Sequence, residues 1–204
     1  MVSGKILRFD KKTLDSTGLF LTVFRTACER GYGKPDSARF QKEGYIFGVS
    51  GAAALYSRKM LDEIRLGSEY FDNAFGFFYE DLDIAWRGKN FGWRGYYVSS
   101  AIVYHLRGGT ARSCEGRGNN KIARRYLNNE LYFNLLKNRY LAIIKNDSLP
   151  GFLVNFIFIL LYDIASWGTV ILFRPQLIKK LSSIKAQVVL AFRKRKILLK
   201  KRKK

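Results

Sequence analysis

The sequence is poor in three residue types that often carry chemistry: it has two cysteines, one histidine, and 16 acidic residues against 37 basic ones. Cys28 and Cys114 lie far apart and form no C-x-x-C pair, so neither a zinc knuckle nor a disulfide framework is expected. This predicts a reducing, cytoplasmic setting. Residues 1–18 contain no apolar run followed by a cleavage site, so we expect no signal peptide.

The chain has a formal net charge of +21, and its acidic residues are unevenly distributed. No acidic residue follows Asp163, whereas basic residues continue to Lys204. Two interpretations of this tail are open: it contacts an anionic partner, lipid or nucleic acid, or it is a solvated and partly disordered terminus. No nucleic-acid fold and no regular interleaving of basic and aromatic residues accompanies the charge, so we expect no nucleic-acid partner.

The hydrophobic pattern predicts an α/β structure in the first three quarters of the chain. Turn residues predict a turn at residues 13–18, and glycine-rich polar segments predict loops at 31–42 and 107–121. Ser57 is an expected helix N-cap, and Pro150 is an expected helix limit. The predicted strands are 5–9, 45–56 and 96–104, and the predicted helices are 58–64, 81–90 and 122–145.

Residues 151–173 form the most hydrophobic stretch and are long enough to cross a bilayer, for which about 20 residues suffice. Asp163 in its middle would cost roughly 2.5 to 3.5 kcal/mol there. Polar residues recur at helical spacing and form one stripe, which favours a helix lying in the membrane interface: Asn155, Tyr162, Asp163, Ser166 and Thr169. Residues 177–199 mix apolar and basic residues in the same way. We therefore expect peripheral contact with an anionic membrane surface; the alternative is a soluble helical cap.

A group of three acids, Glu80, Asp81 and Asp83, stands between an aromatic run and an amphipathic helix. Such acids often do no more than stabilise the first turn of a helix. Here the Phe-Phe-Tyr run places them beside apolar surface, and Glu80 repels Asp81, conditions that tune a carboxylate as a general base. Asp83 is interpreted as an ordinary helix-start residue. His105, the only histidine, ends a predicted strand, and a lone histidine is more often structural than a metal ligand.

Three runs together resemble a known family: GVSGAAALYSRKMLDEI, YFDNAFGFFYEDLDIAWRGKNFGWRGYYV and AIVYHLRGGT. Their order and spacing are similar to the C-terminal half of family 2 glycosyltransferases, in particular the rhamnosyltransferase-like members that build bacterial surface polysaccharides. The resemblance spans about Gly4 to Asp147. It implies that residues 1–147 are the acceptor-side half of a GT-A mixed sheet with helices. Residues 148–204 would then be a helical membrane-association tail on the inner face of the cell membrane.

The resemblance also implies an activity, which is inverting transfer of a sugar from a nucleotide-sugar donor to a glycan or lipid-linked acceptor. Asp81 would be the catalytic base that deprotonates the acceptor hydroxyl, and Glu80 would support it. His105 would help to hold a divalent metal, Mg or Mn, or the diphosphate. The remaining implied contacts are Gly48, Ser50, Gly51 and Arg87 at the acceptor, and Arg107 and Arg112 at the phosphates.

One departure from the family concerns the donor side. The family's nucleotide-binding half, a βαβαβ unit that carries a metal-binding Asp-x-Asp, does not precede Lys5. We therefore expect the chain to start midway through the fold and to need the other half for donor binding. The Gln-x-x-Arg-Trp motif of processive members is absent, which favours transfer of a single sugar. A second hypothesis is a non-catalytic, membrane-binding remnant of such an enzyme.

Overall fold

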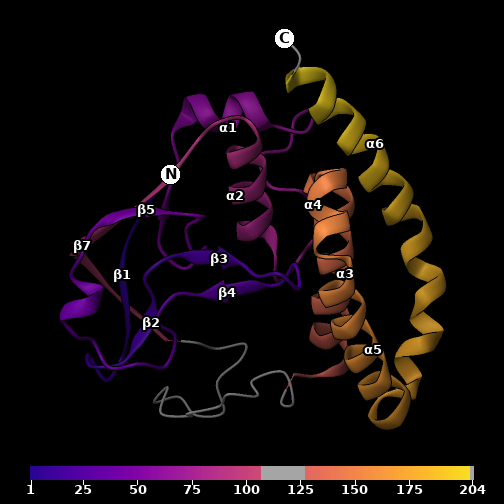
Figure 1. Cartoon of the computed structure of the whole chain (residues 1–204), viewed down its shortest axis with the longest axis horizontal. Coiled ribbons are helices and arrows are strands. Elements are labelled where there is room, and N and C mark those ends of the chain that lie inside the picture. The colour runs from indigo at the N-terminus through magenta and orange to yellow at the C-terminus, as the bar shows by residue number, and fades with distance from the viewer. Residues whose placement is uncertain (107–126, 203–204) are drawn as a thin grey trace.

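The computed structural model describes residues 1–106 and 127–202, which form a mixed α/β structure with a curled mixed sheet (Figure 1). The strands are β1 (Val2–Arg8), β2 (Leu14–Ser16), β3 (Leu19–Leu21), β4 (Ala27–Glu29), β5 (Gly44–Ile46), β6 (Ala54–Leu55) and β7 (Gly95–His105). The helices are η1 (Ala38–Phe40), α1 (Arg58–Ile64), α2 (Glu80–Asn90), α3 (Asn129–Asn146), α4 (Leu149–Val154), α5 (Phe156–Phe173), η3 (Pro175–Ile184) and α6 (Lys185–Arg202).

The main sheet has five strands, in the order β2-β1-β7-β5, with β6 also paired to β1. Strands β1 and β7 are parallel, and the other pairs are antiparallel. Parallel strands need a long crossover, and residues 9–94 with helices α1 and α2 supply it. The register between β1 and β7 shifts after Gly4, where a Cβ would lie 2.1 Å from the Ala101 carbonyl oxygen. Only glycine therefore fits at this bulge.

The predicted strands are confirmed in part. The strand expected at 5–9 is β1, which starts earlier, at Val2, and the strand expected at 96–104 is β7, which His105 ends. The continuous strand expected at 45–56 is wrong, because only its two ends form strands, β5 and β6, and Gly48 between them makes a single isolated bridge to Leu19. The turn expected at 13–18 is also wrong, because β2 pairs there with β1.

Helix α2 lies at the centre of the molecule and is buried on two sides. On the sheet side, Ile84 and Ala85 belong to a cluster that includes Met1, Val49, Met60 and Tyr97. On the other side, Leu82 packs in a cluster with Phe75, Tyr79, Leu141 and Ala191. The second cluster joins α2 to α3 and α6, so residues of the C-terminal segment complete the core around α2.

The C-terminal helices pack on the α/β part. The helix expected at 122–145 is α3, which starts at Asn129 within the described residues, and Asn155 divides the expected helix at 151–173 into α4 and α5. Helix α6 lies along α3 on the outside of the molecule (Figure 1). Near its end, Lys201 donates hydrogen bonds to the carbonyls of Glu63 and Arg65. Over residues 185–202, the interpretation of the basic tail as a partly disordered terminus is therefore wrong.

Candidate functional site at the start of helix α2

The backbone just before α2 has an unusual conformation. Phe78 and Tyr79 have φ values of 70° and 71°, in the left-handed region that bulky side chains rarely adopt. Such residues cost of order 1 to 3 kcal/mol each and cluster at functional sites. Asn138 of α3 holds this loop, because its Nδ2 donates to the carbonyl oxygens of Phe75, Phe77 and Phe78, each at 2.7 Å. The loop thereby delivers the acids of α2 in a fixed position.

Asp81 lies in the first turn of α2 and faces the loop that follows β5. Its Oδ2 accepts a hydrogen bond of 3.0 Å from the Gly51 N–H, and its Oδ1 accepts one of 2.7 Å from the Leu82 N–H. A Cβ at Gly51 would lie 3.4 Å from the Asp81 Cβ, so the two backbones approach closely. Asp81 is half-buried, and Gly51 is exposed. The structure thus brings together two of the residues predicted to share a site.

Glu80 and Tyr56 stand beside Asp81, and each has a buried oxygen with no hydrogen-bond partner among the described residues: Glu80 Oε2 and the Tyr56 hydroxyl. Burial raises the pKa of Tyr56, and the charges of Asp81 and Glu80 raise it further. Burial, followed by the charge of Asp81, also raises the pKa of Glu80. An orphaned buried polar atom is costly, so these two oxygens are unfavourable features concentrated beside Asp81.

Tyr56 is a site residue that the sequence analysis missed. Its ring packs edge to face on Phe71, with ring centroids 5.9 Å apart. The only local signal was its position at the end of the Gly-Ala-Ala-Ala-Leu-Tyr run, shortly after Gly51. Nothing in that run indicates that the hydroxyl reaches the acids of α2.

Ser50 is buried, and its side chain fixes the loop that follows β5 instead of facing an open surface. Its Oγ donates a hydrogen bond of 2.9 Å to Glu29 Oε1, and Ser16 Oγ donates to the other oxygen of the same carboxylate. Glu29 ends β4 and Ser16 ends β2, so these contacts tie the loop to two strands. Ser50 therefore positions Gly51, its neighbour in the chain.

Two further residues predicted to border an acceptor, Arg87 and Gly48, are buried as Ser50 is. Arg87 is fully buried and donates to Asp83 Oδ2 at 2.9 Å and to the carbonyls of Ile64 and Tyr70 at 2.8 Å each. Gly48 is also buried, and a Cβ there would lie 2.4 Å from the Cβ of Ala85. Neither residue presents exposed surface in this structure, and their contact with an acceptor stays a prediction. They set how closely α2 packs on its neighbours.

Asp83 is more than a helix-start acid. It is fully buried, and besides Arg87 it binds Lys145 Nζ at 2.9 Å and Asn146 Nδ2 at 2.7 Å. Lys145 also pairs with Asp72, which in turn binds Lys194 of α6 at 2.7 Å. This chain of buried ion pairs joins α2, α3 and α6 and keeps the start of α2 in place.

His105 ends β7, and its Nδ1 lies 2.7 Å from Asp15 Oδ2. Within residues 1–106 and 127–202, no three His, Cys, Asp or Glu side chains come together in a way that could hold a metal ion. His105 and Asp15 alone do not make a Mg or Mn site, so the role of His105 in holding a metal stays a prediction. Arg107 and Arg112, the predicted phosphate ligands, lie outside the described residues.

Comparisons of the chain with protein-family models, with curated proteins and with solved structures found no match. The resemblance to family 2 glycosyltransferases therefore rests on the order of the motifs in this sequence.

Proposed function

We propose that the chain is the acceptor-side half of an inverting GT-A glycosyltransferase of family 2. It would act on a nucleotide-sugar and a glycan or lipid-linked acceptor. The observation that supports this most is the position of Asp81, held by the Gly51 N–H and flanked by the orphaned oxygens of Glu80 and Tyr56. A sugar acceptor carries several hydroxyl groups, which both donate and accept hydrogen bonds, so its chemistry matches that of the site.

In the proposed reaction, Asp81 removes the proton of an acceptor hydroxyl. The acceptor oxygen forms a bond to the anomeric carbon of the donor sugar while the bond from that carbon to the nucleotide diphosphate breaks. Attack on the face opposite the leaving group inverts the configuration of the carbon. The hydrogen bonds from Gly51 and Leu82 fix the carboxylate before the acceptor arrives, which favours a productive geometry.

Glu80 and Tyr56 would orient the acceptor. Because the pKa of Glu80 is raised, its neutral form persists to a higher pH than in a free glutamate, and a neutral carboxyl both donates and accepts. The pKa of Tyr56 is raised too, so its hydroxyl stays protonated and can donate to a sugar oxygen. Each group would gain in a bound sugar the partner that it lacks among the described residues.

The test measures sugar transfer by the chain joined to the nucleotide-binding half that the family resemblance requires. We expect Asp81→Asn to lower the transfer rate by about 10² to 10⁴, the usual contribution of a general base, and to leave nucleotide binding unchanged. Asp62→Asn is the matched control, because Asp62 is an exposed acid paired with Arg58 on α1. Transfer that survives Asp81→Asn would refute the role of Asp81.

A second candidate function, membrane binding without catalysis, is favoured by the outer surface of α4 and α5. The described residues contain one helix, α5, that is long and apolar enough to cross a membrane. Its polar stripe turns toward α3, since Asp163 pairs with Arg139 at 2.6 Å and Ser166 is buried. The apolar side chains consequently face outward, with large exposed fractions at Leu149, Leu153, Val154, Ile157, Leu161, Ile164, Ile171, Leu172 and Phe173.

Flotation of the chain with vesicles tests this second function. Exposed basic residues of η3 and α6 would attract anionic lipid: Lys179, Lys180, Lys185, Arg193, Lys196 and Lys200. Each is worth about 1 kcal/mol near such a surface, so binding to vesicles with phosphatidylserine should exceed binding to neutral vesicles. Equal binding to both would exclude the electrostatic contribution, and a chain that binds vesicles but transfers no sugar would favour this function over the first.

A further inference from the structure

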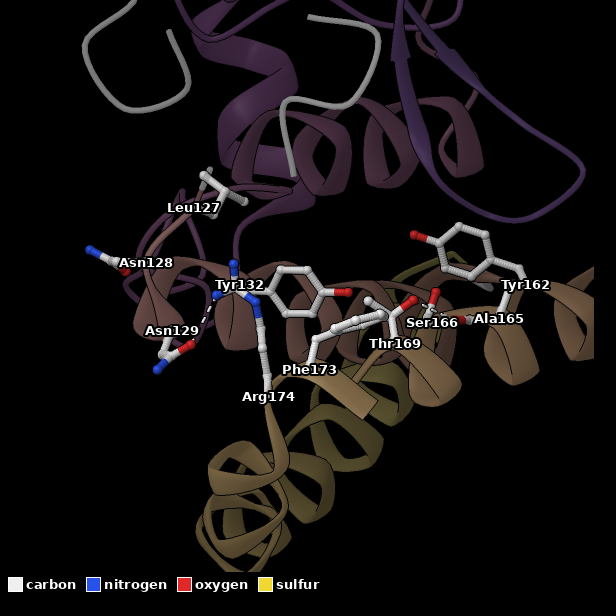
Figure 2. A pocket seen from close by; sticks show the side chains of 10 residues that line it. All are labelled: Leu127, Asn128, Asn129, Tyr132, Tyr162, Ala165, Ser166, Thr169, Phe173 and Arg174. Carbon is white, nitrogen blue, oxygen red and sulfur yellow. Dashed lines mark hydrogen bonds between the residues drawn. The ribbon is translucent and has the colours of Figure 1, made fainter. Parts of the chain in front are cut away.

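A groove with a volume of about 940 Å³ lies between the start of α3 and the second half of α5 (Figure 2). Ligand sites commonly have volumes of about 300 to 1,000 Å³, so the groove is large enough for a molecule with both a head group and a chain. It is lined by part of the polar stripe of α5, namely Tyr162, Ser166 and Thr169, and by Tyr132 of α3. Part of the polar stripe predicted from the sequence therefore lines a groove between two helices.

One end of the groove carries a basic side chain. Arg174 stands there, next to Tyr132 and Asn129 (Figure 2). Its Nη1 donates a hydrogen bond of 2.9 Å to Asn129 Oδ1, and its guanidinium carbon lies 4.6 Å from the centre of the Tyr132 ring. These contacts orient the guanidinium, which is suited to bind a phosphate through several N–H groups. None of the described residues that line the groove is acidic.

The rest of the groove is mainly apolar and continues to the exposed surface of α5. Phe173 lies along the groove between Arg174 and the Tyr162 end (Figure 2), and its side chain is 74% exposed. Leu172 next to it is 73% exposed. A hydrocarbon chain that entered past Phe173 would thus leave the groove directly at the most apolar face of the molecule.

We propose that this groove binds the phosphate and the adjoining hydrocarbon of a lipid phosphate, with Arg174 at the phosphate and the chain along Phe173 and Thr169. The inference rests on the proposed function in one respect, because it makes the lipid phosphate the anchor of the acceptor. It fits the lining, which combines one cation at one end, small and hydroxyl side chains along the floor, and an apolar exit. A free anion would make no contact with the apolar part of the groove, and a neutral lipid would form no ion pair with Arg174.

The test titrates the full chain with geranyl phosphate, geraniol and inorganic phosphate in separate calorimetric experiments. We expect geranyl phosphate to bind at least tenfold more tightly than either of the other two. Arg174→Gln should weaken its binding about tenfold, since a hydrogen-bonded ion pair is lost, and Arg174→Lys should retain part of the affinity. Thr169→Trp should fill the groove and also weaken binding; Thr169 is exposed, so this variant leaves the core intact. Arg39→Gln, an exposed position on η1, is the control and should bind as the unchanged chain does.

Three results would overturn the proposal. The first is wild-type affinity in both Arg174→Gln and Thr169→Trp, with thermal unfolding showing that both variants are folded. The second is equal affinity for geraniol, which would mean that no head-group site exists. The third is equal affinity for inorganic phosphate, which would mean a free-anion site. Since the titration needs no donor and no transfer, failure of the Asp81→Asn prediction would leave this result standing, and the reverse also holds.

Discussion

Replacing Asn138 by Leu is expected to loosen the loop that delivers Glu80 and Asp81 to the candidate site. Asn138 is fully buried in α3, and its Nδ2 is within 2.7 Å of three carbonyl oxygens of residues 75–78. Leucine has nearly the same shape but no N–H group. The substitution therefore removes the donor without creating a large cavity, and it leaves buried carbonyls without a partner.

The magnitude follows from the number of donors. The amide NH₂ group has two hydrogens, which the three carbonyls share. The loss of each buried hydrogen-bond donor costs about 1 to 2 kcal/mol. The same hydrogen bonds hold Phe78 and Tyr79 in left-handed conformations that are unfavourable on their own. Asn138 Oδ1 is buried without a hydrogen-bond partner among the described residues, so its removal offsets part of this loss. We therefore expect Asn138→Leu to lower the free energy of unfolding by roughly 2 kcal/mol.

Urea unfolding followed by circular dichroism measures this difference. Asn134→Leu is the matched control, because Asn134 lies one turn earlier on α3 and is half-buried, and we expect it to change the free energy by less than about 0.5 kcal/mol. If Asn138→Leu also stays within that margin, Asn138 does not hold the loop. In the transfer assay, the same variant should lose activity at a urea concentration where it is still folded.

Two further predictions concern the supports of α2. Although burial alone would raise it, the charge of Lys145 and hydrogen bonds from Lys145 and Lys194 hold the pKa of Asp72 at about 2, below 3.8. Asp72 thus adds about 2 kcal/mol to the free energy of unfolding above pH 3.8, and this contribution is lost as the pH falls toward 2. Asp72→Asn should therefore unfold more easily at neutral pH, and its free energy of unfolding should fall less between pH 4 and pH 2 than that of the unchanged chain. Gly48→Ala should lower the free energy of unfolding by about 1 to 3 kcal/mol, because its Cβ would overlap Ala85, whereas Gly51→Ala should change it little; equal denaturation midpoints for the two variants would contradict the packing described for Gly48.

Local signals in the sequence predicted individual elements well. Ser57 caps α1 as expected, with its Oγ accepting from the Met60 N–H, and α2 ends shortly before Gly92, whose φ is 86°. Such signals act within a few residues of the chain, so they can be read without knowledge of the fold. The order of motifs likewise predicted that Gly51 and Asp81 belong to one site.

The long-range contacts could not be predicted in this way. The position of Asp83 in the first turn of α2 indicates a helix-start acid, and the family resemblance implies a separate acceptor contact for Arg87. The role of Asp83 is set by Lys145 and Asn146, which lie some 60 residues further along the chain and reach it only through the packing of α3 on α2. Arg87 in turn binds Asp83 and the carbonyls of Ile64 and Tyr70. The same holds for Tyr56, whose position beside Glu80 depends on how α2 meets the loop before α1.

The basic tail shows how a composition signal changes once contacts are known. Its excess charge suggested a segment free to bind an anionic partner. In the structure, however, Lys194 pairs with Glu69 at 2.9 Å and with Asp72 at 2.7 Å. Burial alone would lower the pKa of Lys194, but the hydrogen bonds and charges of these two acids raise it above its usual value. Part of the positive charge of the tail is therefore matched inside the protein.

This pairing also limits how the tail can meet a membrane. If α6 left α3 to insert into lipid, Asp72 would lose one of its two cations, and breaking a buried ion pair costs about 3 to 5 kcal/mol. Several new contacts with anionic lipid, at about 1 kcal/mol each, would be needed only to offset that loss. Membrane contact through the exposed side of α5, with α6 still docked, avoids the cost. The groove at Arg174 opens on that same side of α5, which places a bound lipid phosphate where its chain can remain in the membrane.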